Sequence, residues 1–266
     1  MDITIYLDKS VEENAQIYFE QAKKARRKLE GAYRAIEVTK KKLLREEKSH
    51  SKSVALTESL VKERSRRKSW FEKFRWFISS DGILIIGGRD ASSNELVIKK
   101  HMDSWNVVFH TEAPGSPFVV VKNEKDEIIP ESTKFEAAIF TATNTRAWDL
   151  NIKSVDVFEV MPDQITKEAK SGEFVSKGSF MIYGVRKHYS VSVELAVGYF
   201  LKDDFKVIMS GPLSAVSKKC KEFVLLKQGT IKKGDMAKKL MNKFGLVTND
   251  DLLSVLPAGR FDFSKK

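Results

Sequence analysis

Residues 70–91 read WFEKFRWFISSDGILIIGGRDA, and here the sequence changes from a helical to a strand-like period. Gly82 to Gly87 is an apolar β run bounded by turn residues, so a strand is expected there. The turn Gly87-Gly88-Arg89-Asp90 follows, and Asp90 is suited to cap a helix from Ala91 to Met102. A globular unit is therefore expected to begin at Trp70.

The rest of this unit predicts an α+β fold. Helices are expected at 134–150 and 232–245, and strands at 106–110, 117–122, 154–160, 178–183, 193–201, 205–210 and 223–227. Because regular helices do not separate the strands, the sheet is expected to be mixed or antiparallel. We divide the unit into a core at 70–200 and a C-terminal extension at 201–266.

The first 69 residues carry a heptad pattern. Apolar residues lie seven apart from Ala15 to Leu43, and a second series runs from Val11 to Thr39. Asp8 or Ser10 is a suitable helix N-cap. The segment 48–53 has three serines and no apolar residue, so a turn is expected there, with a second helix from about Val54 to Lys68. The prediction for 1–69 is an antiparallel coiled-coil helical hairpin.

Positive charge is concentrated on this arm. The chain has a net charge of +11, and residues 1–69 contribute +7 of it. Such an excess favours polyanionic partners, with nucleic acid first and an anionic membrane second. Three basic clusters could contact phosphates, or could simply be solvated faces of a coiled coil. They lie at 23–28, at 40–45 and at 64–68.

Several functional classes are disfavoured. Cys220 is the single cysteine, which excludes an internal disulfide and fits a reducing cytoplasm. The four histidines show no metal-ligand spacing, so no metal or cofactor is expected. No apolar stretch is long enough to span a membrane, and the N-terminus does not resemble a signal peptide.

Two motifs admit a structural and a functional interpretation. The Gly87–Asp90 turn could place backbone N–H groups and Arg89 around an anion, or could be a tight turn capped by Asp90. Trp70, Phe74 and Phe77 would share one helix face, which favours a core position over a stacking platform.

No catalytic constellation is legible, and the chain is not expected to be an enzyme. Ser116 lacks the nucleophile-elbow pattern, and Cys220 has no acid–base partner near it in sequence. His110 ends a strand before a Gly/Pro loop, a common place for functional residues, although a structural role is favoured. The alternative is an RNA-modifying or nucleotide-using enzyme with its site near Arg89 and His110. A third hypothesis, an anionic-membrane or adhesin role, is disfavoured by the alanine-rich seam.

At these motifs the chain resembles the NFACT-R family, the RNA-binding domain of the NEMF/RqcH/fibronectin-binding-protein-A group. The resemblance rests on ordered motifs at 70–77, 87–91 with Asn94-Glu95, 107–110, 115–117, 119–122, 178–184 and 194–198. The arm, with its motifs at 9–11, 14–15 and 23–32, is similar to the middle coiled coil of that family, and the archaeal members fit best. Asn106 stands where the family usually has Asp, and Thr111-Glu112 where it has Ala-Asp.

The resemblance implies a role in ribosome-associated quality control. It implies binding to the large ribosomal subunit that carries peptidyl-tRNA after a stall, and recruitment of tRNA for C-terminal tailing. The N-terminal domain of the family is not expected in this chain, which would make it a fragment or a split member that binds RNA without supporting tailing. The expected partners are ribosomal RNA and tRNA, and the expected location is the cytoplasm.

The candidate RNA contacts combine both lines of reasoning. On the globular unit they are Arg75, Gly87, Gly88, Arg89, Asp90, His110, Gly115, Ser116 and Lys122. On the arm they are Lys23, Lys24, Arg26, Arg27, Lys28, Lys40, Lys41, Lys42, Arg66 and Arg67.

Overall fold

The computed structural model describes residues 4–63, 68–113, 115–124, 127–168, 175–245 and 247–264, with the side chains of 44–63 left out of the description. The chain forms two compact units, Met1–Val61 and Lys62–Lys266. Each unit is described by itself.

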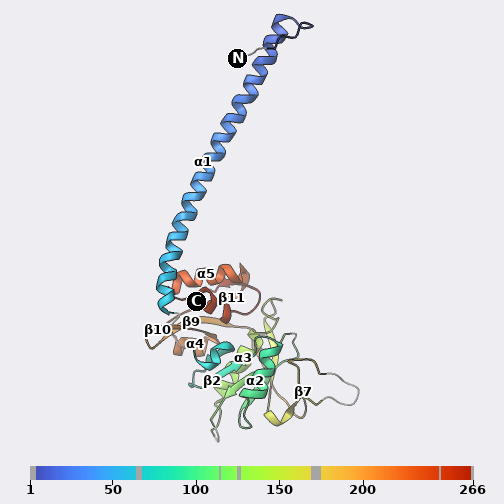
Figure 1. The fold of residues 1–266 in the computed structure, drawn as a ribbon. Coiled ribbons are helices and arrows are strands. Elements are labelled where there is room, and N and C mark those ends of the chain that lie inside the picture. The colour runs from blue at the N-terminus through green and yellow to red at the C-terminus, as the bar shows by residue number, and fades with distance from the viewer. Residues whose placement is uncertain are drawn as a thin grey trace. The chain divides into compact units, whose positions relative to one another are not determined.

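The first unit is dominated by one long helix, α1 (Val11–Glu63) (Figure 1). Ser10 caps it, as one of the two predicted caps. The Ser10 hydroxyl accepts from the N–H of Glu13 at 3.2 Å, and the Glu13 carboxylate accepts from the N–H of Ser10 at 2.8 Å. This reciprocal pair satisfies donors that would otherwise have no partner at the helix start.

The predicted hairpin is wrong, because α1 continues through 48–53 without a turn. This segment contains neither glycine nor proline, and serine costs a helix only about 0.5 kcal/mol relative to alanine. Within the described part of the arm, the predicted seam is largely exposed, with Leu29, Ile36 and Leu43 at 57%, 54% and 59%. The heptad pattern therefore produced a helix without a second helix folded back on it.

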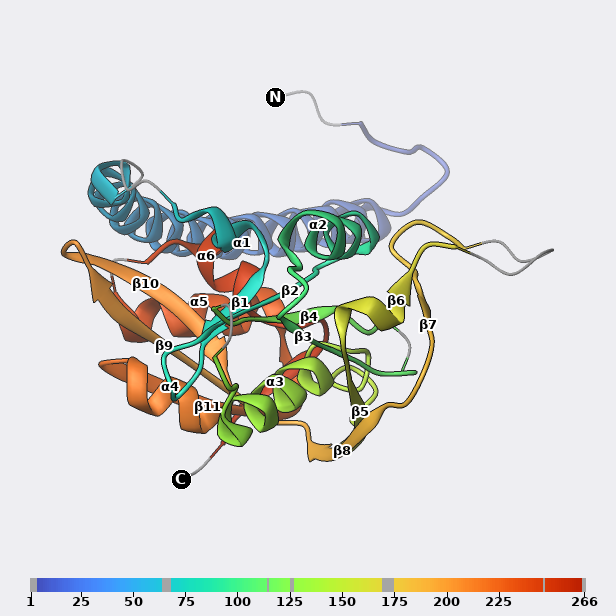
Figure 2. The same cartoon turned by 90° about the horizontal axis from the view of Figure 1, so that it is seen from below.

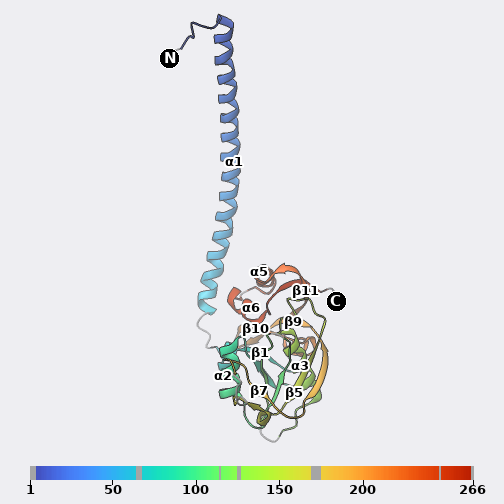
Figure 3. The same ribbon diagram turned by 90° about the vertical axis from the view of Figure 1, so that its right-hand side faces the viewer.

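The second unit is built on a six-stranded, fully antiparallel sheet. Helices α2 (Ala91–His101) and α3 (Glu131–Thr143) lie on opposite faces of this sheet (Figures 2 and 3). In spatial order the strands are β1 (Arg75–Ile78), β2 (Leu84–Gly87), β4 (Val119–Lys122), β3 (Val107–His110), β5 (Ser154–Val160) and β8 (Lys187–Ser192).

A four-stranded antiparallel sheet follows in sequence. Its order is β10 (Phe205–Gly211), β9 (Leu195–Lys202), β11 (Glu222–Lys232) and β12 (Arg260–Phe263). Helices α4 (Leu213–Lys219), α5 (Lys233–Phe244) and α6 (Asn249–Val255) pack with it. A small ladder joins β6 (Ile165–Thr166) to β7 (Met181–Ile182), and single 3-10 turns lie at Trp70–Lys73 and Pro162–Gln164.

Alternation along β9 explains how the two sheets share a core. Leu195, Val197 and Tyr199 join the cluster formed with α5 and α6. Ala196 and Phe200 join the core of the six-stranded sheet instead. Because successive side chains of a strand point to opposite faces, the four-stranded sheet is buried on both sides. The predicted α+β class is confirmed, and its sheets are antiparallel.

The helix face predicted for Trp70, Phe74 and Phe77 is wrong. Trp70–Lys73 is a single 3-10 turn, and residues 75–78 form the edge strand β1. Phe74 and Phe77 are nonetheless buried, whereas Trp70 is 47% exposed and stacks on His101. Both faces of β1 are covered, because the neighbouring residues Trp76 and Phe77 are both buried.

No helix among the described residues combines the length and the apolar character needed to cross a membrane.

Phe77 is a sensitive point of the core. Its ring packs on Phe140 with centroids 4.8 Å apart, and it lies so close to Gly211 that a Cβ there would be 3.1 Å away. We expect Phe77→Ala to lower the free energy of unfolding by about 3–5 kcal/mol, because it leaves a cavity where the two sheets meet. Phe263→Ala, at a position that is 39% exposed, is the matched control, and urea denaturation measures both. Equal effects of the two variants would contradict the shared core.

Candidate functional site

An open cavity of about 430 Å³ lies in the second unit. Four segments meet around it: the β2–α2 turn, the loop after β3, the C-terminal end of α3, and the segment before β7. Six predicted site residues line this cavity, although up to 28 positions separate them in sequence: Gly88, Arg89, Asp90, His110, Gly115 and Ser116.

The β2–α2 turn depends on Gly88. A Cβ atom on Gly88 would lie 1.9 Å from Oδ1 of Asn94, so only glycine fits. The space lets the Asn94 side chain cross the turn, where Oδ1 accepts a 3.0 Å hydrogen bond from the N–H of Phe118. Gly88 N–H donates to the carbonyl of Phe118 at 3.2 Å. The start of α2 is thereby tied to the residue before β4.

A second close approach forms another wall. Gly178 has a φ of +79°, and a Cβ there would lie 2.4 Å from Cα of Ala91. Its N–H donates to the Glu95 carboxylate at 3.2 Å, and that carboxylate also lies 3.7 Å from Nζ of Lys167. Gly178 was not among the predicted site residues. Two signals could have identified it: a glycine close before a short strand, and its place at the start of the 178–184 motif that carries the family resemblance.

Asp90 is a helix cap. Its carboxylate accepts from the N–H of Ser93 at 2.8 Å, and this hydrogen bonding to Ser93 lowers the pKa of Asp90. The N–H groups of Arg89 and Asp90 donate to the Ser93 hydroxyl. The N-terminus of α2 therefore already holds a carboxylate, which favours the tight-turn interpretation over an anion bound by the backbone.

Arg75 and Arg89 bring two positive charges together beside the cavity. Arg75 donates to Oδ1 of Asn144, a cavity-lining residue, at 2.6 Å, and Arg89 donates to the carbonyl of Phe74 at 2.8 Å. Burial, and then repulsion from Arg89, lowers the pKa of Arg75 to about 10. Burial, followed by repulsion from these two arginines, lowers the pKa of Lys233 to about 8. Closely spaced, partly desolvated cations favour a bound anion.

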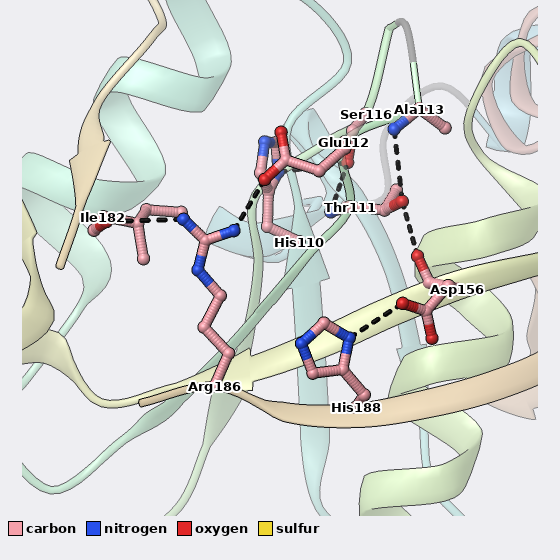
Figure 4. Close-up of polar contacts among 9 residues, drawn as sticks. All are labelled: His110, Thr111, Glu112, Ala113, Ser116, Asp156, Ile182, Arg186 and His188. Atoms are coloured by element: carbon pink, nitrogen blue, oxygen red, sulfur yellow. Dashed lines mark hydrogen bonds and ion pairs between the residues drawn. The ribbon is translucent and has the colours of Figure 1, made fainter. Parts of the chain in front are cut away.

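His110 is held by the loop that follows it (Figure 4). Its ring stacks on Phe118 with centroids 4.0 Å apart, and Nδ1 lies 3.0 Å from the carbonyl of Pro117 and 3.0 Å from the Ser116 hydroxyl. A carbonyl oxygen only accepts, so Nδ1 carries the proton and donates it. His110 therefore cannot take a proton from Ser116 through Nδ1, and the two residues do not form a nucleophile–base pair.

Two further polar pairs that the sequence did not single out lie near His110 (Figure 4). Arg186, just before β8, donates to Glu112 at 2.6 Å, and its guanidinium lies 4.4 Å from the centre of the Phe158 ring. His188 on β8 pairs with Asp156 at 2.7 Å. The partners in each pair come from different strands or loops and lie far apart in the sequence, so no short sequence motif predicts them.

Two more cations lie at the cavity mouth. Lys177 lines the cavity and is exposed. Arg146 is exposed as well, and its side chain runs so close to Gly115 that a Cβ there would be 3.2 Å from it. Gly115 has a φ of +75°, which a glycine adopts without strain. Neither cation was among the predicted contacts.

Other predicted contacts lie away from the cavity lining. Lys122, at the end of β4 farther from the loop, donates to the carbonyl of His101 at 2.9 Å and pairs with Asp103 at 2.5 Å. Gly87 closes β2, and its missing Cβ avoids a 3.0 Å contact with Val119. The predicted arm cations Lys23, Lys24, Arg26, Arg27, Lys28, Lys40, Lys41 and Lys42 are exposed on α1, and Arg66 and Arg67 lie outside the described residues.

Cys220 is buried at the end of α4. Burial raises the pKa of its thiol to about 12, against a smaller opposing effect of Lys219. A thiol held in its neutral form is a poor nucleophile.

The span that holds this cavity matches a known domain. Residues 73–184 match the family model described as the NFACT protein RNA binding domain, and every cavity-lining residue falls inside them. This span is an NFACT RNA-binding domain.

Similar proteins agree with this assignment. The archaeal Rqc2 homolog aRqcH of Methanocaldococcus jannaschii is 38% identical over 210 residues, which cover 78% of this chain and 31% of that protein. The ribosome quality control complex subunit NEMF homolog of Drosophila melanogaster is 35% identical over a stretch that covers 72% of this chain and 19% of that protein. The human ribosome quality control complex subunit NEMF is 34% identical over a stretch that covers 70% of this chain and 17% of that protein. The chain belongs to the NEMF/RqcH proteins and spans less than a third of the length of these relatives.

Gly88 offers a direct test of the site architecture. We expect Gly88→Ala to lower the free energy of unfolding by more than about 2 kcal/mol, because the new methyl group displaces the Asn94 bridge. Gly234→Ala is the control, since nothing lies within 4 Å of a Cβ there and the position is helical. That change should stabilise α5 by up to about 1 kcal/mol. Thermal unfolding compares the two variants. A Gly88→Ala variant as stable as the unmodified chain would refute the crossing of the turn by the Asn94 side chain.

His110 predicts a pH dependence. Burial is the main cause that lowers its pKa below the usual 6.5, so below about pH 6.5 the unfolded chain binds a proton that the folded chain does not. The free energy of unfolding should therefore fall as the pH drops from about 6.5 to 5. Burial also lowers the pKa of His101, so the unmodified chain has to be compared with a variant. In His110→Phe the free energy of unfolding should fall less steeply with decreasing pH than in the unmodified chain. An NMR titration of the His110 ring with a pKa above 6.5 would contradict this.

Proposed function

We propose that this chain is the RNA-binding module of a ribosome-associated quality control factor. It binds the large ribosomal subunit that still carries peptidyl-tRNA after a stall, and it helps to recruit tRNA for C-terminal tailing of the nascent chain. The single observation that carries the proposal is that Arg75 and Arg89 lie close together, partly desolvated, beside a cavity inside the NFACT RNA-binding domain.

The names of the relatives support the setting. They are called subunits of a ribosome quality control complex, or homologues of one. Because this chain covers less than a third of their length, tailing belongs in this proposal to the longer proteins. The chain by itself supplies the RNA contact, and ribosomal RNA and tRNA are its proposed partners in the cytoplasm.

The proposed activity is binding, without catalysis. The Nδ1 proton of His110 is donated to the carbonyl of Pro117, which removes the geometry that a Ser116 nucleophile would need. Burial keeps the Cys220 thiol protonated. These contacts favour a binding module over the RNA-modifying alternative near Arg89 and His110.

The arm supplies a second set of phosphate contacts in this proposal. The clusters at 23–28 and 40–42 are exposed, so their charges are available to a phosphate backbone. Some arm charges are already paired along the helix, such as Lys41 with Glu37 at 3.4 Å, but exposed pairs of this kind contribute little energy.

Binding should depend steeply on salt. If the chain neutralises about six phosphates, log K against log salt should be linear with a slope of about −5. Sedimentation with stalled large subunits over a salt series measures it. Binding that does not respond to salt, or no binding at all, would refute the proposal.

A matched pair of variants tests whether the arm contacts phosphates or only adds to the overall positive charge. The triple change Lys40→Gln, Lys41→Gln and Lys42→Gln should reduce the slope by about 1 for each phosphate contact that is lost. The change of Lys238, Lys239 and Lys243 on α5 to Gln removes the same charge from exposed positions and should leave the slope nearly unchanged. Equal slopes for both variants would argue against phosphate contacts by this part of the arm.

A further inference from the structure

The cavity of the NFACT domain has the size of a small-ligand site. Its volume of about 430 Å³ lies within the range of about 300–1,000 Å³ found for small-molecule pockets. An RNA helix presents a broad surface, whereas an unpaired nucleotide can enter a hollow. Proteins that read RNA sequence mostly bind such unpaired bases, by stacking and by hydrogen bonds to their edges.

Aromatic rings make one side of the cavity. His110 stacks on Phe118, and Phe180 meets Phe118 edge to face with centroids 5.4 Å apart. All three residues line the cavity, and Phe180 and His110 are only half-buried. Aromatic walls of this kind are typical of sites that bind the faces of nucleobases.

One acceptor and one donor remain available beside these rings. Nδ1 of His110 is committed to the Pro117 carbonyl, and Nε2, an acceptor in this tautomer, has no hydrogen-bond partner among the described residues. Oδ1 of Asn94 is committed to Phe118, which leaves the Asn94 amide N–H groups likewise without a described partner. Backbone contacts thus fix the orientation of both side chains. A nucleobase edge offers the complementary donors and acceptors.

Charge at the mouth favours a phosphate. Lys177 lines the cavity, and Arg146 lies along Gly115 at its edge. Arg89 adds positive charge nearby, while its guanidinium donates to the carbonyls of Glu72 and Phe74. The two lining carboxylates are already engaged, Asp90 by the first turn of α2 and Glu112 by Arg186. Lys177 and Arg146 form no ion pair within the described part of the chain.

We infer that this cavity receives one unpaired nucleotide of the bound RNA, with the base inside and its phosphate at Lys177 and Arg146. The inference rests on the proposed RNA-binding function and adds the place and the form of recognition. The close approaches at Gly88 and Gly178 fix the walls before binding, so little ordering accompanies entry of the base.

The test compares two short RNA hairpins that differ only by one bulged nucleotide, with fluorescence anisotropy on the whole chain. We expect the bulged hairpin to bind at least about fivefold more tightly, because stacking of one base contributes that much or more. Nucleoside monophosphates at millimolar concentration should shift the backbone NMR signals of residues 88–94, 110–118 and 177–180.

Variants locate the effect. His110→Phe keeps a ring against Phe118 and removes the Nε2 acceptor, so it should reduce the preference for the bulge. Lys177→Glu, at an exposed position, should reduce it as well without disturbing the core. Lys238→Glu on α5 makes the same change of charge away from the cavity lining and should keep the preference.

The outcomes separate this inference from the proposed function. Equal affinity for the two hairpins, or monophosphate shifts confined to other residues, overturns the nucleotide cavity while RNA binding stands. Equal loss of the preference in Lys177→Glu and Lys238→Glu overturns it too. Failure to bind either hairpin or large subunits at low salt overturns both.

Discussion

The hydrogen bond from the N–H of Phe118 to the Asn94 side chain, made across Gly88, holds the candidate site together. It joins the first turn of α2 to the residue before β4, and so it sets where the loop after β3 returns to the sheet. The path of this loop in turn fixes the positions of His110 and Ser116. The bridge exists because glycine leaves room for the amide group.

Around this bridge, carboxylates stabilise the fold, whereas arginines supply positive charge beside the cavity. Asp90 and Glu112 could have opposed a phosphate, but the helix cap and Arg186 engage them. Arg75 and Arg89 lie close together, and burial, followed by repulsion from Arg89, lowers the pKa of Arg75. The structure thus gathers positive charge at one cavity while its carboxylates stabilise the fold.

Much of the second unit could be predicted from the sequence because its patterns are local. Asp90 was predicted as a cap, and the strands at 84–87, 107–110 and 119–122 fall inside the predicted runs. Strand β8 and helix α4 were missed: the first alternates weakly, and the second is only seven residues long. The hairpin failed for a related reason, since serines weaken a helix without ending it.

By itself, the sequence determined the α+β class, the basic arm, the Gly87–Asp90 turn and the resemblance to the NFACT-R family. These follow from composition and from neighbouring residues, which a single chain displays directly. Only the tertiary structure brought Gly88, His110, Gly178 and Arg146 around one cavity, and only it paired Arg186 with Glu112. Such contacts depend on strand order and on close backbone approach, and neither leaves a local mark in the sequence.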